Sequence, residues 1–129
     1  MPHPELNFSR IAYICLYCSN VDDSIRFYRD VLGLKVLSQS PEFTCFDTGA
    51  TKLAIEPGGV RKNGKKELSE NPVLLQIAAH SAEELAAMDR HLETHGVKLL
   101  TRSKSTPYGI ITNFVDPDGN KLEIICPST

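Results

Sequence analysis

One short sequence pattern occurs twice in this chain, and the repeat restricts the folds that the chain can adopt. Residues 33–37, GLKVL, match residues 96–100, GVKLL, which lie 63 positions later. The spacing is too long for a solenoid repeat, so two copies indicate one domain with pseudo-twofold symmetry. A copy of about 50 residues buries too little surface to be stable alone, so we expect the two copies to share a core.

The first copy predicts a strand, a helix and three further strands. Apolar residues alternate over 10–18, as in a half-buried strand, and Asn20 then offers a side-chain cap for a helix. This helix ends at Gly33, a residue suited to the left-handed position that follows many helices. Its apolar stripe consists of Val21, Ile25, Tyr28 and Leu32. Short strands are predicted over 34–38, 43–47 and 52–56.

The second copy repeats this order. A strand is predicted over 73–79, and Ser81 with Glu84 forms a capping box for a helix that ends near Gly96. A tight turn at Asp116-Pro117-Asp118-Gly119 joins the last two strands. The three strands after the helix are predicted over 97–102, 109–115 and 121–126.

The two copies define modules at about 10–56 and 72–126, within one domain that spans residues 1–129. Residues 57–72 are rich in Gly, Lys, Asn and Glu and predict a solvated connector. A phosphate or carboxylate substrate is one possible partner for the cations of this connector, although such a charge run usually forms a solvated loop. These cations are Arg61, Lys62, Lys65 and Lys66.

Composition excludes several function classes. Fourteen Lys and Arg against 16 Asp and Glu leave a net charge of −2, which gives no electrostatic reason to bind nucleic acid or anionic lipid. No apolar run approaches the roughly 20 residues of a membrane span, and no secretory signal is visible, so we expect a soluble, cytoplasmic protein. Cys15 and Cys18 point to opposite faces of the predicted strand, so we expect reduced cysteines.

Two segments of the chain resemble the vicinal oxygen chelate superfamily, which includes glyoxalase I, extradiol dioxygenases, fosfomycin-resistance enzymes and bleomycin-binding proteins. Residues 20–34, with Phe27-Tyr28 and Leu32-Gly33, look like its first helix, and residues 114–123, FVDPDGNKLE, look like its closing hairpin. The resemblance implies an α+β fold in which tandem β-α-β-β-β modules form a half-barrel, the glyoxalase/bleomycin resistance/dioxygenase fold. The concave face of this half-barrel would hold a small-molecule ligand.

The resemblance also implies one metal-ligand position near the start of each module. In the first module this position falls on Tyr13, whose phenol stays protonated near pKa 10 and is a poor ligand. In the second module it is Gln76 at the 63-residue offset, or Leu74 if the second helix carries an insertion. Gln is a weak oxygen ligand, and Leu cannot bind a metal.

A further position lies on the last strand of each module. It is Glu123 in the second module and either Glu56 or Ala54 in the first. Glu123 and Glu56 are therefore the candidate catalytic residues, and with Gln76 they are the metal ligands if a metal is bound. The four histidines, His3, His80, His91 and His95, lie outside these positions. The candidate set thus lacks the imidazole ligands that a zinc site prefers.

An apolar cavity with hydroxyl groups for orientation would be lined by several of the remaining candidates. The candidate ligand-binding residues are Tyr13, Gln76, Tyr108, Phe43 and Phe46. Phe43 and Phe46 are equally consistent with ordinary core aromatics. The segment 103–107 is a candidate loop that closes over the cavity mouth.

Two functions follow from the resemblance. The first is a protein that binds a small organic ligand in a concave cavity without a standard metal site and without a cofactor. The second is a divalent-metal-dependent, glyoxalase-like lyase, isomerase or dioxygenase that acts on a small oxygenated metabolite, so enzymatic activity is left open. A regulatory or structural dimer has no positive feature in its favour. In each case we expect a homodimer, because two-module members commonly pair and open strand edges favour pairing.

Overall fold

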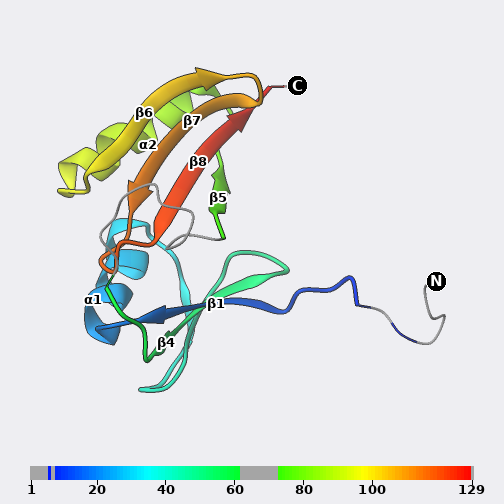
Figure 1. Ribbon diagram of the computed structural model, residues 1–129, viewed down its shortest axis with the longest axis vertical. Coiled ribbons are helices and arrows are strands. Elements are labelled where there is room, and N and C mark those ends of the chain that lie inside the picture. Colours follow the sequence, from blue (N-terminus) through cyan, green and yellow to red (C-terminus); the bar gives the residue numbers. More distant parts are fainter. Residues whose placement is uncertain (1–5, 7, 62–72, 129) are drawn as a thin grey trace. The chain divides into compact units, whose positions relative to one another are not determined.

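The computed structural model describes residue 6 and residues 8–61 and 73–128. The chain divides into two compact units, Met1–Val60 and Arg61–Thr129, and each is described here by itself. Figure 1 shows strands and a helical segment in both units. None of the helices in the described residues has the length and apolar character that crossing a bilayer requires.

The first unit follows the predicted order of one strand, one helical segment and three strands. Its elements are β1 (Tyr13–Cys18), α1 (Val21–Ile25), the π-helical segment η1 (Arg26–Val31), β2 (Val36–Gln39), β3 (Thr44–Phe46) and β4 (Lys52–Pro57). The sheet has the strand order β1-β4-β3-β2. The first strand, β1, runs parallel to β4, whereas β4 with β3 and β3 with β2 are antiparallel.

The second unit repeats the same topology. Its elements are β5 (Leu75–Ala78), α2 (Ala82–Thr94), β6 (Leu99–Thr106), β7 (Gly109–Val115) and β8 (Lys121–Pro127). The strand order is β5-β8-β7-β6, with β5 parallel to β8 and the other pairs antiparallel. The predicted α+β fold with tandem β-α-β-β-β modules is therefore confirmed.

Both helical segments, α1 with η1 and α2, begin and end where the sequence predicts. Asn20 caps α1, because its side-chain oxygen accepts a hydrogen bond from the Asp23 backbone N–H at 3.0 Å. Ser81 caps α2 in the same way, because its hydroxyl accepts from the Glu84 backbone N–H at 3.0 Å. The carboxylate of Glu84 reaches back to the His80 N–H at 2.8 Å, one residue earlier than in a standard capping box. Past each helix, Gly33 and Gly96 both adopt φ +76°, which favours glycine.

The helix predicted over 21–32 differs from a regular α-helix in its second half. The backbone N–H of Leu32 donates to Phe27 O at 3.0 Å, five residues back, which is the hydrogen bond of a π-helix. Phe27 and Tyr28 are both buried, and their rings meet edge to face with centroids 5.1 Å apart. Apolar spacing alone did not distinguish this π-helical turn from an α-helical one.

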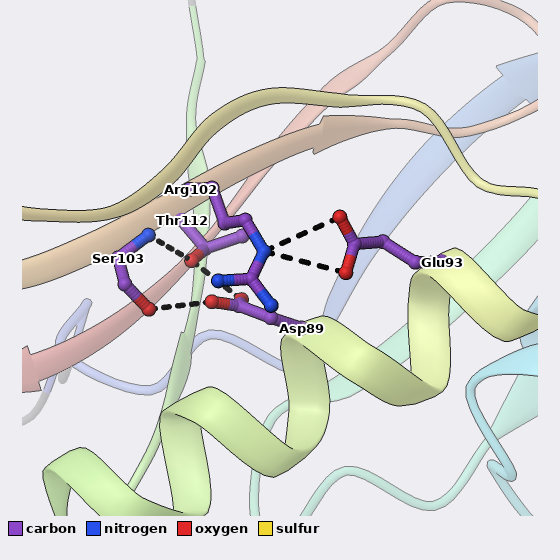
Figure 2. Close-up of polar contacts among 5 residues, drawn as sticks. All are labelled: Asp89, Glu93, Arg102, Ser103 and Thr112. Carbon is purple, nitrogen blue, oxygen red and sulfur yellow. Dashed lines mark hydrogen bonds and ion pairs between the residues drawn. The ribbon is translucent and has the colours of Figure 1, made fainter.

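Helix α2 packs along one face of its sheet (Figure 1), and a buried polar cluster marks that contact. Asp89 is fully buried on α2, and its Oδ1 accepts a hydrogen bond from Thr112 Oγ1 of β7 at 2.6 Å. Its Oδ2 accepts from the Ser103 hydroxyl of β6, and Ser103 N–H donates to Thr112 Oγ1 at 2.9 Å. Figure 2 shows these groups together with the nearby ion pair between Glu93 and Arg102.

The segment predicted to be a loop over 103–107 is mostly strand. β6 continues past the predicted end at Arg102 to Thr106, and Lys104, Ser105 and Thr106 pair with β7. The register shifts between Thr101 and Lys104, and Ser103 adopts φ 43° at this irregularity. The polar sequence of this segment did not indicate a strand. The strand is stabilised by its pairing with β7 and by hydrogen bonding to Asp89.

Hydrogen bonding to Asp89 also identifies the two faces of the second sheet. Because Thr112 contacts α2, the residues that alternate with it or pair with it face the helix as well. The fully or almost fully buried Phe114, Leu122 and Ile124 form this helix-facing side. Asn113 and Glu123 lie between them in sequence and therefore point to the face opposite α2.

The first sheet is arranged in the same way. Phe46 lies against Tyr28 of η1, with ring centroids 5.9 Å apart, so its side of β3 faces the helix. Leu53 and Ile55 on β4 are buried on the same side, since Phe46 pairs with Leu53. Tyr13 and the other odd-numbered residues of β1 point to the opposite face.

Candidate functional site

Three polar side chains form a row across the second sheet, on the face opposite α2. Gln76 of β5 pairs with Glu123 of β8, and Asn113 of β7 pairs with Glu123 from the other side. Gln76 Nε2 donates to Glu123 Oε1 at 2.7 Å, and Asn113 Nδ2 donates to Glu123 Oε2 at 2.7 Å. We call this set the Glu123 row.

Local structure fixes this register. The carboxylate of Asp116, at the start of the turn between β7 and β8, accepts hydrogen bonds from the backbone N–H groups of Asp118 and Asn120, both at 2.9 Å. Gly119 in the same turn adopts φ +79°. Residues at equal distances from the turn therefore face one another, which places Asn113 opposite Glu123.

The row differs in exposure from one end to the other. Glu123 is 7% exposed and Asn113 is fully buried, whereas Gln76 on the edge strand β5 is exposed. An ionised carboxylate only accepts hydrogen bonds, so both amides must turn their NH₂ groups toward it and their carbonyl oxygens away. Asn113 Oδ1 is left buried, and it has no hydrogen-bond partner among the residues described.

Glu123 also has no ion-pair partner among the described residues. Within the described part of the chain, no lysine, arginine or histidine forms an ion pair with it; the ion pairs found there belong to other carboxylates. A buried carboxylate without a counter-charge is costly, and the two amide donors offset only part of that cost. Glu123 is therefore a buried negative group whose oxygens can accept further hydrogen bonds.

The first sheet carries a different group of side chains on its face opposite η1. Tyr13 meets Phe43 edge to face, with ring centroids 5.3 Å apart. Partial burial raises the pKa of the Cys15 thiol, and the hydrogen bond and negative charge of the Glu56 carboxylate raise it further. A raised pKa leaves less of the reactive thiolate at neutral pH, so the surroundings of Cys15 do not activate it.

The structure also shows which positions of the two modules correspond. Tyr13 precedes the helix cap Asn20 by seven residues, and Leu74 precedes Ser81 by the same number. Leu74, the alternative that an insertion in the second helix predicted, is therefore the counterpart of Tyr13. The 63-residue offset that pairs Tyr13 with Gln76 holds only after the helices, because α2 has two more residues between its cap and its terminal glycine.

The counterpart of Gln76 is Cys15, which pairs with Ala54 as Gln76 pairs with Glu123. Ala54 therefore occupies the position that corresponds to Glu123. Glu56 lies two residues further along β4, beside Tyr17. Its roles as catalytic residue and metal ligand stay predictions.

The remaining candidates are dispersed. Phe46 is fully buried on the helix-facing side of the first sheet and acts there as a core residue. Tyr108 is 79% exposed in the turn between β6 and β7. Lys62, Lys65 and Lys66 of the predicted connector lie outside the described residues.

Asn113 was missed by sequence reasoning, although a signal for it was present. The turn at 116–119 was recognised, and counting outward from it along both strands places Asn113 opposite Glu123. An asparagine in an otherwise apolar strand was therefore detectable as a partner of the glutamate.

The donor set around Glu123 does not fit a zinc-type metal site. Both carboxylate oxygens are engaged by amide N–H groups, and an NH₂ group that faces a carboxylate cannot coordinate an ion. His80 precedes α2, His91 lies on it and His95 follows it as the C-cap, so none of the three lies on the sheet. Among the described residues, no group of three or more His, Cys, Asp or Glu side chains is arranged to hold a metal.

Comparison with known proteins identifies the family of this chain. Metallothiol transferase FosB of Staphylococcus saprophyticus is 27% identical over 124 residues, which cover 88% of this chain and 74% of that protein. TnmS3, an antibiotic binding protein from Streptomyces sp. CB03234, has a similar fold, with a TM-score of 0.72 at 21% identity. That alignment covers 95% of this chain and 99% of TnmS3.

A glyoxalase-related enzyme from Fulvimarina pelagi has the same fold, with a TM-score of 0.75 at 23% identity over 92% of this chain and 88% of that one. The sequence profile of the Glyoxalase/Bleomycin resistance protein/Dioxygenase superfamily matches residues 10–124, which is most of the chain. The chain therefore belongs to the Glyoxalase/Bleomycin resistance protein/Dioxygenase superfamily.

Proposed function

We propose that this protein binds a small organic ligand through the second-sheet face that carries the Glu123 row, and that this binding needs no metal ion. The observation that carries the proposal is the hydrogen bonding of Glu123, whose two oxygens accept from Gln76 and Asn113. Two amide donors hold the carboxylate in one orientation, as a recognition group requires. The likeness to TnmS3, an antibiotic binding protein, supports a ligand-binding role.

A metal-dependent enzyme is the second candidate, and the FosB relatives favour it. They are 27–28% identical to this chain, and their name states that they are metallothiol transferases. The amide contacts of Glu123 count against this candidate. A metal ion at Glu123 would require Gln76 or Asn113 to give up its hydrogen bond and turn its oxygen inward.

Calorimetric titration separates the two candidates. Protein stripped with a chelator is titrated with zinc, nickel, manganese and magnesium, and is separately screened against aromatic fragments by NMR. We expect weak metal binding, together with fragment-induced shifts of the amide signals of residues 76, 113 and 123 in the presence of chelator. One ion bound per chain, and lost in Glu123→Gln, would establish the metal-dependent candidate instead.

Glu93→Gln is the matched control for that substitution. Glu93 lies in the same unit on α2, where it is exposed and paired with Arg102, so its replacement removes the same charge from a different place. This variant should bind ions and fragments as the unmodified protein does. Equal losses in both variants would mean that the binding reflects overall charge rather than the row.

A further inference from the structure

Charge and hydrogen-bonding capacity at the Glu123 row define the kind of ligand group that it accepts. Glu123 is 7% exposed and has no cationic partner among the described residues. A carboxylate offers about four acceptor sites, and Gln76 and Asn113 use two of them. The unused sites lie on a charged group, where each further hydrogen bond is of the strong, charge-assisted kind.

Asn113 provides a second, independent observation. Its side chain is fully buried, and its Oδ1 has no hydrogen-bond partner in the described residues. A buried acceptor without a partner costs free energy, so such an atom in a folded protein calls for an explanation. The carboxylate can accept further hydrogen bonds and this carbonyl oxygen accepts none among the described residues, so both atoms favour a ligand that donates hydrogen bonds.

From these two observations we infer that the Glu123 row recognises a cationic nitrogen group of the ligand, such as an amidinium, guanidinium or protonated amine. The inference rests on the proposed function and adds the chemical class of the ligand. Glu123 supplies the negative charge and accepts N–H hydrogen bonds, and the uncommitted amide oxygen of Asn113 adds a further acceptor. Gln76, on edge strand β5, is the exposed member of the row.

Three compounds of nearly the same shape test this inference. Benzamidine is cationic at neutral pH, benzamide is neutral and benzoate is anionic. Each is titrated into the ¹⁵N-labelled chain in the presence of chelator, and the amide signals of residues 76, 113 and 123 are followed. We expect benzamidine to bind about tenfold or more tightly than benzamide, with benzoate weakest, because the cation adds charge-assisted hydrogen bonds.

A lysine at position 76 places the ligand's proposed charge within the protein itself, and a lysine on α2 controls for the added charge. In Gln76→Lys, the ammonium group sits beside Glu123 and takes the place of the ligand cation, so benzamidine binding should fall about tenfold or more. Ala87→Lys adds the same charge at an exposed position of α2, on the other side of the sheet from the row, so it should bind benzamidine as the unmodified chain does. Positions 76 and 87 are both exposed, so both variants are expected to fold, which their amide spectra check directly.

Glu123→Gln removes the negative charge of the row. When this variant is folded, it should bind benzamidine no more tightly than benzamide. If benzamide or benzoate binds at these residues as tightly as benzamidine, the inference is wrong while the proposed function stands. Equal benzamidine binding by Gln76→Lys and Ala87→Lys also overturns it. If none of the three compounds shifts these signals up to its solubility limit, the proposed function fails with it.

Discussion

Thr112 and Asp89 are joined by a hydrogen bond in the interior of the second unit. The threonine hydroxyl on β7 donates to the aspartate Oδ1 on α2 (Figure 2), at a distance of 2.6 Å. Both residues are fully buried. The same carboxylate accepts from the Ser103 hydroxyl of β6. One buried acidic group therefore holds a helix and two strands in a fixed arrangement.

Asp89→Asn tests how much this arrangement contributes to stability. An amide of the same shape offers one oxygen in place of two, so one of the two hydroxyls loses its acceptor. We expect the free energy of unfolding to fall by about 1–3 kcal/mol. Chemical denaturation followed by circular dichroism measures the change.

Glu93→Gln serves as the control on the same helix, one turn further on. Its ion pair with Arg102 is exposed on both sides, so the loss should stay below about 1 kcal/mol. A larger loss for Glu93→Gln than for Asp89→Asn would show that the buried cluster is not the stabilising contact.

Backbone strain at Ser103 predicts an unusual order of stabilities. Its φ of 43° lies in the left-handed region that favours glycine, and its hydroxyl donates to Asp89. Ser103→Ala loses the hydrogen bond and keeps the strain, whereas Ser103→Gly loses the same bond but relieves the strain. We expect the glycine variant to be more stable than the alanine variant by up to about 1 kcal/mol, as measured by thermal unfolding. The reverse order would contradict this backbone conformation.

Titration of Cys15 depends on its neighbour Glu56. Burial, followed by the hydrogen bond and charge of Glu56, raises the pKa of this thiol, so less thiolate is present at any pH below that pKa. Glu56→Gln removes the charge, so the pKa should fall and iodoacetamide should modify Cys15 at lower pH. Peptide mass spectrometry across a pH series gives the midpoint for this one cysteine.

Glu42→Gln provides the comparison for this titration, because Glu42 is an exposed glutamate in the same unit that does not contribute to the Cys15 shift. In Glu42→Gln, the midpoint pH of Cys15 modification should equal that in the unmodified chain. A midpoint that stays the same or rises in Glu56→Gln would show that Glu56 does not act on the thiol.

We predict a homodimer in solution. Each four-stranded sheet ends in edge strands, β1 and β2 in the first and β5 and β6 in the second. Edge strands carry backbone groups available for pairing, and this gives the chain a physical reason to associate. Light scattering at micromolar concentration should give twice the mass of the chain, and a mass equal to one chain would disprove the prediction.

Local signals allowed most of the fold to be predicted. Asn20, Ser81 and the two glycines at 33 and 96 act through contacts within a few residues, which a sequence displays directly. The position of Asp89 is a different case. An aspartate on an amphipathic helix normally faces water, and only the hydroxyls of two strands more than ten residues away make its burial favourable.

The candidate site was predictable only in part for a similar reason. Gln76 and Glu123 were both identified, but their direct hydrogen bond joins residues 47 positions apart and depends on a parallel strand pairing. The choice between Ala54 and Glu56 required the register of β1 against β4, which no short pattern encodes. Strand register is set by packing over the whole sheet, so it could be determined only from the three-dimensional structure.

The parallel pairing of β5 with β8, and of β1 with β4, has a consequence for how the chain acquires its structure. The three antiparallel strands of each unit follow one another in sequence and can assemble from nearby contacts. The parallel strand pairs instead with the last strand of its module. Closing so large a loop costs conformational entropy, which slows this pairing. In each module, the strand that is synthesised first is therefore expected to be the last to join its sheet.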